Sequence, residues 1–155
     1  MLDKLSRIKA IGFILWGSWN LSEGKLDYDL KDRKASNVLY AIVVAEEVVY
    51  IGETGNPLHE RIDCYKNATK STNLKVKKTI LEGLGEGKRA EIFVLVDNIY
   101  FRYGECHLVL KAGVDNELIR GENLPQIVVP VTRRLLELIL ILDIKPLLNE
   151  ESKRK

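Results

Sequence analysis

The chain has 155 residues, of which 46% are hydrophobic and 30% charged, so it is long enough to bury a core and has the composition of one globular domain. No apolar run reaches the roughly 18 residues of a membrane-spanning helix, and no signal-peptide cleavage site follows the N-terminus, so we expect no membrane partner. A net charge of +2 excludes little by itself. Cys64 and Cys106 have no metal-ligand spacing, which favours free thiols and a cytoplasmic location.

Residues 1–37 have the weakest pattern of the chain. Apolar residues recur at helical spacing in residues 2–8, whereas "IGFILWGSWNL" is typical of a strand and a turn. Trp16 and Trp19 are candidates for stacking on nucleic-acid bases, although tryptophans are more often core or interface residues.

A β-hairpin is expected next. Val38–Val44 and Val48–Ile51 are apolar runs of strand length on either side of a charged stretch. Glu46 and Glu47 lack the Gly or Asn that a tight two-residue turn needs. We therefore expect a three-residue loop over 45–47.

Two tyrosines ten residues apart, Tyr40 and Tyr50, distinguish this hairpin from an ordinary one. The three-residue loop would pair Tyr40 with Gly52 and Ile42 with Tyr50. Because cross-strand partners share a face and side chains alternate along a strand, both phenols are expected on one face of the sheet. We expect Gly52 to let the chain turn toward the helix that follows.

That helix is predicted within "GNPLHERIDCYKNA". Asn56 is a suitable N-cap, and Pro57 suits the first helical position, where an N–H would have no helical partner. Arg61 and Tyr65 are four residues apart and are therefore neighbours on the helix surface.

Basic residues outnumber acidic ones between positions 61 and 89. A second helix over "NLKVKKTILEGL" would direct its lysines outward, and "AEIFVLV" follows as a strand. Two interpretations stay open: a solvated helix face, or a patch that meets nucleic-acid phosphates. The second interpretation makes nucleic-acid-binding candidates of Lys66, Lys70, Lys75, Lys77, Lys78 and Arg89.

The last predicted helix, from about Thr132 to Asp143, contains one acid within the apolar stretch "LLELILILDI". Burying an unpaired carboxylate is costly, so Glu137 needs a cationic partner. The local pattern allows either Arg133, one turn earlier, or a divalent metal ion in a cleft. Residues 97–130, before this helix, are expected to form further strands and loops.

Taken together, these residues resemble the GIY-YIG nuclease superfamily. Its first motif appears as "VLY" (Val38–Tyr40) and its second as "YIG" (Tyr50–Gly52), with the tyrosine separation typical of the family. Its catalytic arginine, the His or Tyr one turn later, its metal-binding glutamate and the asparagine of its closing "P-x-x-N" match Arg61, Tyr65, Glu137 and Asn149. Each motif alone is weak evidence, but the ordered set across residues 40–149 is strong.

The resemblance implies an α+β fold in which helices flank a small central antiparallel sheet with an N-terminal hairpin. It implies a single domain, 1–155, with an extension at 1–37 and a nuclease core at 38–149. The core would carry an insertion at 71–130, β-rich and placed between the arginine helix and the glutamate helix, of the kind found in restriction enzymes. The chain departs from the family at Val38, where a glycine is usual, and at Glu53, where some members have a lysine.

The implied activity is hydrolysis of phosphodiester bonds in double-stranded DNA, restriction-like or structure-specific, with Mg²⁺ or Mn²⁺ held by Glu137. By resemblance, Arg61 would bind the phosphate and Tyr40 would act as general base. The remaining site residues would orient water and phosphate or brace the site: Tyr50, Tyr65 and Asn149. Cutting both strands would suit a homodimer. The alternative is a nucleic-acid-binding module that keeps the fold without the activity.

Overall fold

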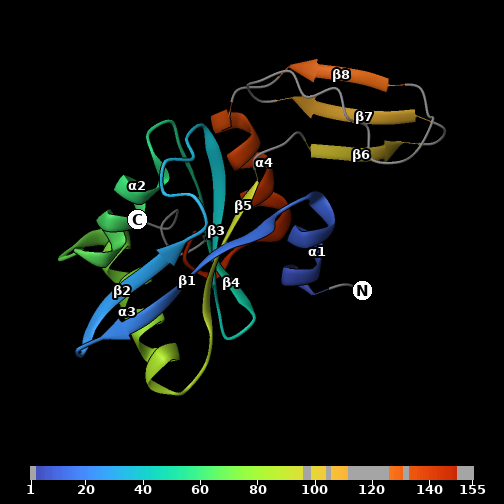
Figure 1. Ribbon diagram of the computed structural model, residues 1–155. Coiled ribbons are helices and arrows are strands. Elements are labelled where there is room, and N and C mark those ends of the chain that lie inside the picture. Colours follow the sequence, from blue (N-terminus) through green and yellow to red (C-terminus); the bar gives the residue numbers. More distant parts are fainter. Residues whose placement is uncertain (1–2, 96–98, 104–105, 112–125, 131–132, 150–155) are drawn as a thin grey trace.

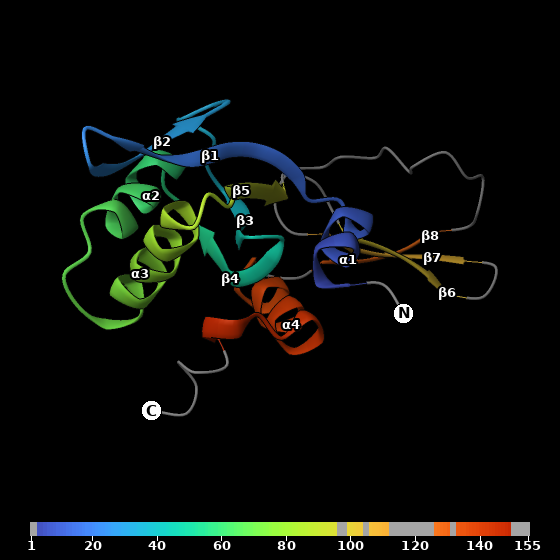
Figure 2. The same cartoon turned by 90° about the horizontal axis from the view of Figure 1, so that it is seen from below.

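Helices on both faces enclose a five-stranded antiparallel sheet (Figures 1 and 2). The computed structural model describes residues 3–95, 99–103, 106–111, 126–130 and 133–149. The strand order is β2-β1-β5-β3-β4. The strands are β1 Ile14–Ser22, β2 Lys25–Leu30, β3 Val38–Val44, β4 Glu47–Thr54 and β5 Ala90–Leu95, and the helices are α1 Lys4–Ile11, α2 Leu58–Lys66, α3 Ser71–Gly85 and α4 Arg133–Ile144. The predicted α+β fold is confirmed.

Strand β3 is buried along its whole length, which explains its unbroken apolar sequence. Its even-numbered residues belong to a core that α2 and α3 cover, together with Ile62 and Ile80 of those helices. Its odd-numbered residues from 39 to 43 belong to a second core on the opposite face, which α1 and α4 cover with Ile8 and Leu140. The central strands therefore have a core on both sides (Figure 2).

The first 37 residues contribute directly to the sheet. The predicted helical spacing corresponds to α1, and "IGFILWGSWNL" corresponds to β1, which pairs with both β2 and β5. Trp19 is buried, with 3% of its surface exposed, and its ring packs edge-on against Tyr28. Trp16 is partly buried, and its indole N–H donates to the carbonyl of Asp32. Trp19 is therefore a core residue.

The β3–β4 hairpin has the expected register at the tyrosines but a different turn. Tyr40 pairs with Gly52 and Ile42 with Tyr50, as predicted. The predicted three-residue loop is wrong: Val44 pairs with Glu47, and a bulge next to Ile42 restores the register. The two turn residues, Ala45 and Glu46, have φ values of 52° and 67°, so non-glycine residues adopt the left-handed conformation here.

Helix α2 begins one residue later than predicted. Pro57, with extended backbone angles, is the N-cap, and no side chain caps the helix, so the expected capping by Asn56 is wrong. The first helical N–H groups donate instead to main-chain carbonyls of the segment before β3: Leu58 to Ala35 at 2.7 Å and His59 to Arg33 at 3.0 Å. These two bonds satisfy N–H groups that have no partner within the helix.

A second, three-stranded sheet lies in the chain between β5 and α4. It consists of β6 Ile99–Tyr103, β7 Cys106–Lys111 and β8 Gln126–Pro130, with β6 antiparallel and β8 parallel to the central β7. This is the β-rich segment expected between the arginine helix and the glutamate helix. Helix α3 and strand β5, which precede it, belong to the main layers. None of the described helices is long and apolar enough to span a membrane.

Candidate active site

Two tyrosines and one arginine form a hydrogen-bonded triangle on the sheet face that α2 covers. The phenol oxygens of Tyr40 and Tyr65 lie 2.6 Å apart. Arg61 donates from Nε to the Tyr40 hydroxyl at 2.9 Å and from Nη2 to the Tyr65 hydroxyl at 3.1 Å. Tyr50 completes the cluster, with its ring 5.9 Å from the Tyr65 ring at an interplanar angle of 64°. The structure thus brings together the tyrosines and the arginine that the sequence singled out.

Helix α2 holds Arg61 in place because the neighbouring side chains of the same helix are anchored in the core. Leu58, Ile62 and Tyr65 are fully buried and fix the rotation of the helix about its axis. One turn separates Arg61 from Tyr65, and the guanidinium carbon lies 4.9 Å from the centre of the Tyr65 ring. The arginine is therefore positioned by its stacking on Tyr65 as well as by its two hydrogen bonds.

Gly52 has a different role from the one we expected. It lies inside β4, directly opposite Tyr40, so it does not turn the chain toward α2. A Cβ atom added at Gly52 would lie 2.3 Å from the Tyr40 hydroxyl oxygen and 2.5 Å from the ring carbon that carries it. The glycine therefore leaves the space into which the Tyr40 phenol fits.

Burial sets the protonation of the two hydrogen-bonded tyrosines. Desolvation raises the pKa of Tyr40 well above its ordinary value, and the charge of Arg61 only partly opposes this shift. Burial likewise raises the pKa of Tyr65. Both phenols are therefore neutral at pH 7. Among the described residues, Arg61 has no carboxylate within ion-pair distance, and its two side-chain hydrogen bonds go to tyrosine hydroxyl groups.

The two remaining predicted site residues lie along the outer edge of β4. Asn149, with 6% of its surface exposed, accepts from the Ile51 N–H at 2.8 Å and donates to the Ile51 carbonyl at 3.0 Å. Two residues further along the same edge, the main chain of Glu53 lies close enough to the Glu137 carboxylate to lower its pKa. Residues two apart on an edge strand direct their N–H groups to the same side. The Ile51 groups that Asn149 bonds and the Glu53 N–H therefore lie on the same edge of β4.

Glu137 is half-buried, and Arg133 is not its partner. Arg133 donates from Nε to Oε2 of Glu53 at 2.6 Å and from Nη1 to Oδ1 of Asn37 at 3.1 Å. The pKa of Glu137 is raised, first by desolvation and then by the negative charge of Glu53, while Arg134 and Arg61 lower it. A salt bridge to Arg133 thus does not supply the cationic partner that the sequence required for Glu137.

The donor set suits a divalent cation. No group of three or more His, Cys, Asp or Glu side chains that could hold a metal ion occurs among the described residues. Mg²⁺, however, keeps several waters and is commonly bound through one or two carboxylates together with substrate phosphates. Glu137, whose negative charge is disfavoured by burial and by Glu53, is a carboxylate that a cation would stabilise.

The predicted nucleic-acid-binding residues fall into two places. Lys66 ends α2, Lys70 is the N-cap of α3, and the next three lie on α3 itself: Lys75, Lys77 and Lys78. Arg89 lies beyond the other end of α3, a helix about 22 Å long, and its guanidinium is 3.8 Å from the Glu46 carboxylate at the β3–β4 turn. The structure does not bring Arg89 together with Lys66 and Lys70.

The fold is similar to that of bacteriophage T4 EndoII. A mutant of that protein matches with a TM-score of 0.51 and 27% sequence identity, over 66% of this chain and 80% of the EndoII chain. Restriction endonuclease HPY188I in complex with product DNA matches with a TM-score of 0.44 and 15% identity, over 70% of this chain and 69% of that one. This second likeness is too distant to support an inference. No family model and no curated protein matches the sequence.

Sequence reasoning missed the role of Arg133. It identified Glu53 as a departure from the family pattern and Arg133 as a possible partner of Glu137, but it did not pair them. The two residues are 80 positions apart, and their contact depends on how α4 packs against β4. The signal that was available is the charge reversal at Glu53, which requires a basic partner wherever that side chain is partly buried.

Proposed function

We propose that the chain is a metal-dependent endonuclease of the GIY-YIG type that hydrolyses phosphodiester bonds in double-stranded DNA. The observation that carries this proposal is the guanidinium of Arg61, held by the hydroxyls of Tyr40 and Tyr65 with no described carboxylate within ion-pair distance. A partly buried arginine of this kind is suited to bind a phosphate through charge-assisted, bidentate hydrogen bonds. The similarity to bacteriophage T4 EndoII supports an endonuclease fold.

In this proposal Arg61 binds the scissile phosphate and stabilises the charge that develops on it in the transition state. The hydrogen-bonded phenols relay a proton: one hydroxyl donates to the other, which leaves the second proton free to bond a water or a phosphate oxygen. Tyr40 is fully buried with a raised pKa, so its own proton must leave before it can act as a base. We propose that the Tyr40 phenolate, stabilised by the charge of Arg61, takes the proton of the Tyr65 hydroxyl, which in turn takes a proton from the attacking water.

We propose that Glu137 holds Mg²⁺ or Mn²⁺ together with ordered waters and the substrate phosphate. The cation, when bound, supplies Lewis-acid stabilisation of the leaving oxygen. We propose that Asn149 braces the edge of β4 beside Glu137 through its two hydrogen bonds to Ile51. The ion pair with Arg133 already balances the Glu53 carboxylate, so we propose Glu137 and not Glu53 as the metal ligand.

We propose that the endonuclease has a restriction-like or structure-specific role. A homodimer would let two sites cut both strands. A cytoplasmic location suits the exposed free thiol of Cys64. The competing function is a nucleic-acid-binding module without activity, and the burial of Tyr40 is the observation that favours it.

The test is cleavage of supercoiled plasmid in Mg²⁺ or Mn²⁺ by wild type, Arg61→Ala and Glu137→Gln. Matched controls remove the same groups elsewhere: Arg7→Ala, from an ion pair with Asp143 on the α1–α4 side, and Glu82→Gln, on the exposed face of α3. We expect nicking by wild type and both controls. Loss of one transition-state contact should lower the rate of each site variant by about 10²–10³-fold.

The outcomes separate the two functions. Equal cutting by all five proteins would reject the assigned site. A wild type that binds plasmid and branched DNA but leaves both intact would reject the nuclease and favour the binding module.

A further inference from the structure

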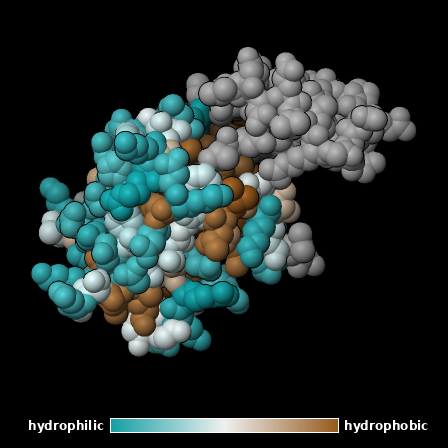
Figure 3. Space-filling model, viewed as in Figure 1, coloured by the Kyte–Doolittle hydropathy of each residue, from teal (hydrophilic) through white to brown (hydrophobic). Residues whose placement is uncertain are grey.

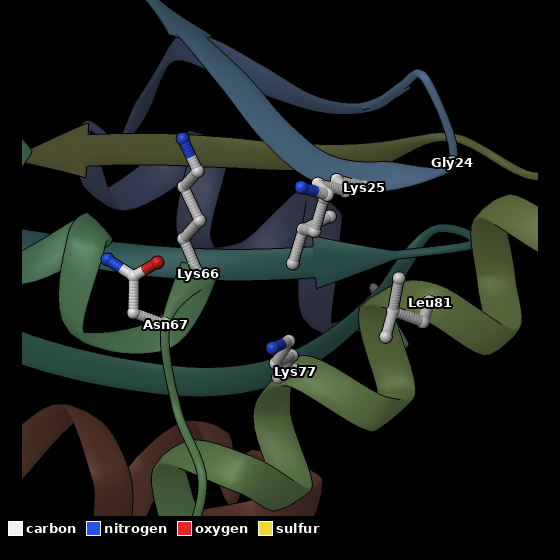
Figure 4. A pocket seen from close by; sticks show the side chains of 7 residues that line it. Gly24, Lys25, Lys66, Asn67, Lys77 and Leu81 are labelled. Carbon is white, nitrogen blue, oxygen red and sulfur yellow. The ribbon is translucent and has the colours of Figure 1, made fainter.

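A groove lined by lysines lies between the β1–β2 hairpin, α2 and α3, apart from the tyrosine cluster. It has a volume of about 480 Å³, and Leu26 and Leu81 form its apolar part. Three lysines from three separate elements line it: Lys25 begins β2, Lys66 ends α2 and Lys77 lies on α3. Asn67, the C-cap residue of α2, adds an amide. Figure 4 shows these side chains around one hollow, and Figure 3 shows that the face of the molecule seen in Figure 1 is largely hydrophilic with scattered hydrophobic patches.

Only one acidic side chain balances these charges among the described residues. Asp27 accepts from Nζ of Lys66 at 3.2 Å, in a pair whose side chains are 47% and 34% exposed. Ion pairs this exposed to solvent contribute little to stability, so Lys66 can exchange Asp27 for another anion at little cost. Within the described part of the chain, Lys25 and Lys77 have no carboxylate at ion-pair distance. The groove therefore has a net positive charge.

The position of the groove relates it to the candidate active site. Arg61 and Lys66 lie on the same helix, and five residues correspond to about 7.5 Å along the axis of α2. This is roughly two base-pair steps of duplex DNA, at about 3.4 Å per step. The same five residues turn the helix by about 140°, so Arg61 faces Tyr40 whereas Lys66 faces Asp27 of β2, and a duplex that contacts both would do so with different parts of its backbone.

We infer that this groove binds the sugar–phosphate backbone of the DNA on one side of the scissile bond. Lysines are flexible point charges, which suit phosphates along a strand and carry no sequence information. The inference rests on the proposed function for the nature of its ligand. It adds Lys25, and with it the N-terminal hairpin, to the DNA-binding surface.

The test is the salt dependence of duplex DNA binding, measured by fluorescence anisotropy in chelator. Lys25→Gln/Lys77→Gln is compared with Lys4→Gln/Lys9→Gln, which removes the same charge from α1 on the opposite face of the sheet. Each phosphate contact contributes about 0.9 to the slope of log affinity against log salt, so the groove variant should lower the slope by about 1.8. The α1 variant should leave it unchanged.

A variant that is expected to bind DNA more tightly controls for misfolding, because a misfolded protein would not gain affinity. Asp27→Asn keeps the Oδ1 acceptor that bonds the Tyr28 N–H and removes the acid that pairs with Lys66, so we expect tighter binding and a steeper slope. Equal slopes for the groove variant and wild type would overturn the inference. So would inorganic phosphate binding that depends on Lys25 and Lys77 without any change in DNA affinity, because the groove would then hold a free anion.

Failure of the inference is distinct from failure of the proposed function. A wild type that cuts DNA, with a slope that the groove variant does not change, would reject the groove alone. A wild type with a groove-dependent slope that never cuts would reject the nuclease alone. A wild type that binds no DNA would reject both.

Discussion

The hydroxyl oxygens of Tyr40 and Tyr65 are 2.6 Å apart, and Arg61 donates a hydrogen bond to each of them. A guanidinium only donates, so the hydrogen bond between the two phenols must use the proton of one of them. The three groups therefore act as a unit, and removing one hydroxyl leaves both its partners with an unmade bond.

We expect Tyr40→Phe and Tyr65→Phe each to lower the free energy of unfolding by about 1–3 kcal/mol, because each removes an acceptor from Arg61 in a buried setting. The double variant should cost less than the sum of the two, by about 0.5–3 kcal/mol, since the second substitution removes a bond that is already broken. Urea denaturation of the four proteins measures this coupling. Strictly additive losses would show that the phenols do not interact in solution.

Gly52 provides a steric test of how Tyr40 is placed. In Gly52→Ala the new methyl group would lie 2.3 Å from the Tyr40 hydroxyl, so the phenol must move out of its contact with Arg61. We expect a loss of about 1–3 kcal/mol in stability together with loss of cleavage. The control is Gly85→Ala in α3, where a Cβ has nothing within 4 Å and alanine favours the helix. Normal cleavage by Gly52→Ala would contradict the importance of the Tyr40 position.

Asn149 links the end of the chain to the second tyrosine motif through the main chain of Ile51. Asn149→Ala would leave a buried N–H and a buried carbonyl of β4 without partners, which should cost about 2–4 kcal/mol. Asn73→Ala, on a partly exposed face of α3, should be neutral or slightly stabilising. Thermal unfolding of the two variants provides the comparison, and equal melting temperatures would mean that water replaces the Asn149 amide.

The sequence predicted the tyrosine face, the arginine helix and the approximate limits of α3, β5 and α4, because each follows from a local period or spacing. The predicted pairing of Tyr40 is correct even though the predicted turn is wrong. The bulge next to Ile42 compensates for a turn one residue shorter than expected, and alternation of the side chains alone could not reveal both changes. Asn56 was a plausible cap, but carbonyls of Ala35 and Arg33 already satisfy the first N–H groups of α2.

Contacts between segments that are distant in the chain could not be predicted from the sequence. The extension at 1–37 has no family motif, yet its strands complete the sheet through β5. Helical spacing made Arg133 one of two possible partners of Glu137, whereas packing of α4 on β4 directs it to Glu53. The excess of basic residues in 61–89 can be seen in the sequence, but only the fold places Lys25 opposite Lys66 and Lys77.

The Glu53–Arg133 pair should be measurable by a double-mutant cycle. Its side chains are 25% and 29% exposed, so the pair is better shielded than the exposed pair of Lys66 and Asp27. We expect a coupling of about 1 kcal/mol between Glu53→Gln and Arg133→Gln in the free energy of unfolding, and less at high salt. The cycle on Lys66 and Asp27 serves as the reference, and a coupling no larger than that reference would show that the Glu53 contact is not formed in solution.

Alkaline titration tests the burial of the tyrosines. Desolvation and the hydrogen bond to Asp63 raise the pKa of Tyr28 to about 12, and burial raises those of Tyr40 and Tyr65 as well, from an ordinary value of 10.0. Below pH 10 both the folded and unfolded states hold these protons, so the stabilisation is fully present. Above pH 10 the unfolded chain releases them first, and the free energy of unfolding must fall as the pH rises through the folded pKa values.

We expect near-ultraviolet absorbance to show these three phenols still protonated at pH 10.5 in the native protein, whereas all tyrosines titrate near pH 10 in urea. Identical native and denatured titration curves would mean that Tyr40 and Tyr65 are open to water, and a phenol open to water could exchange its proton without Arg61.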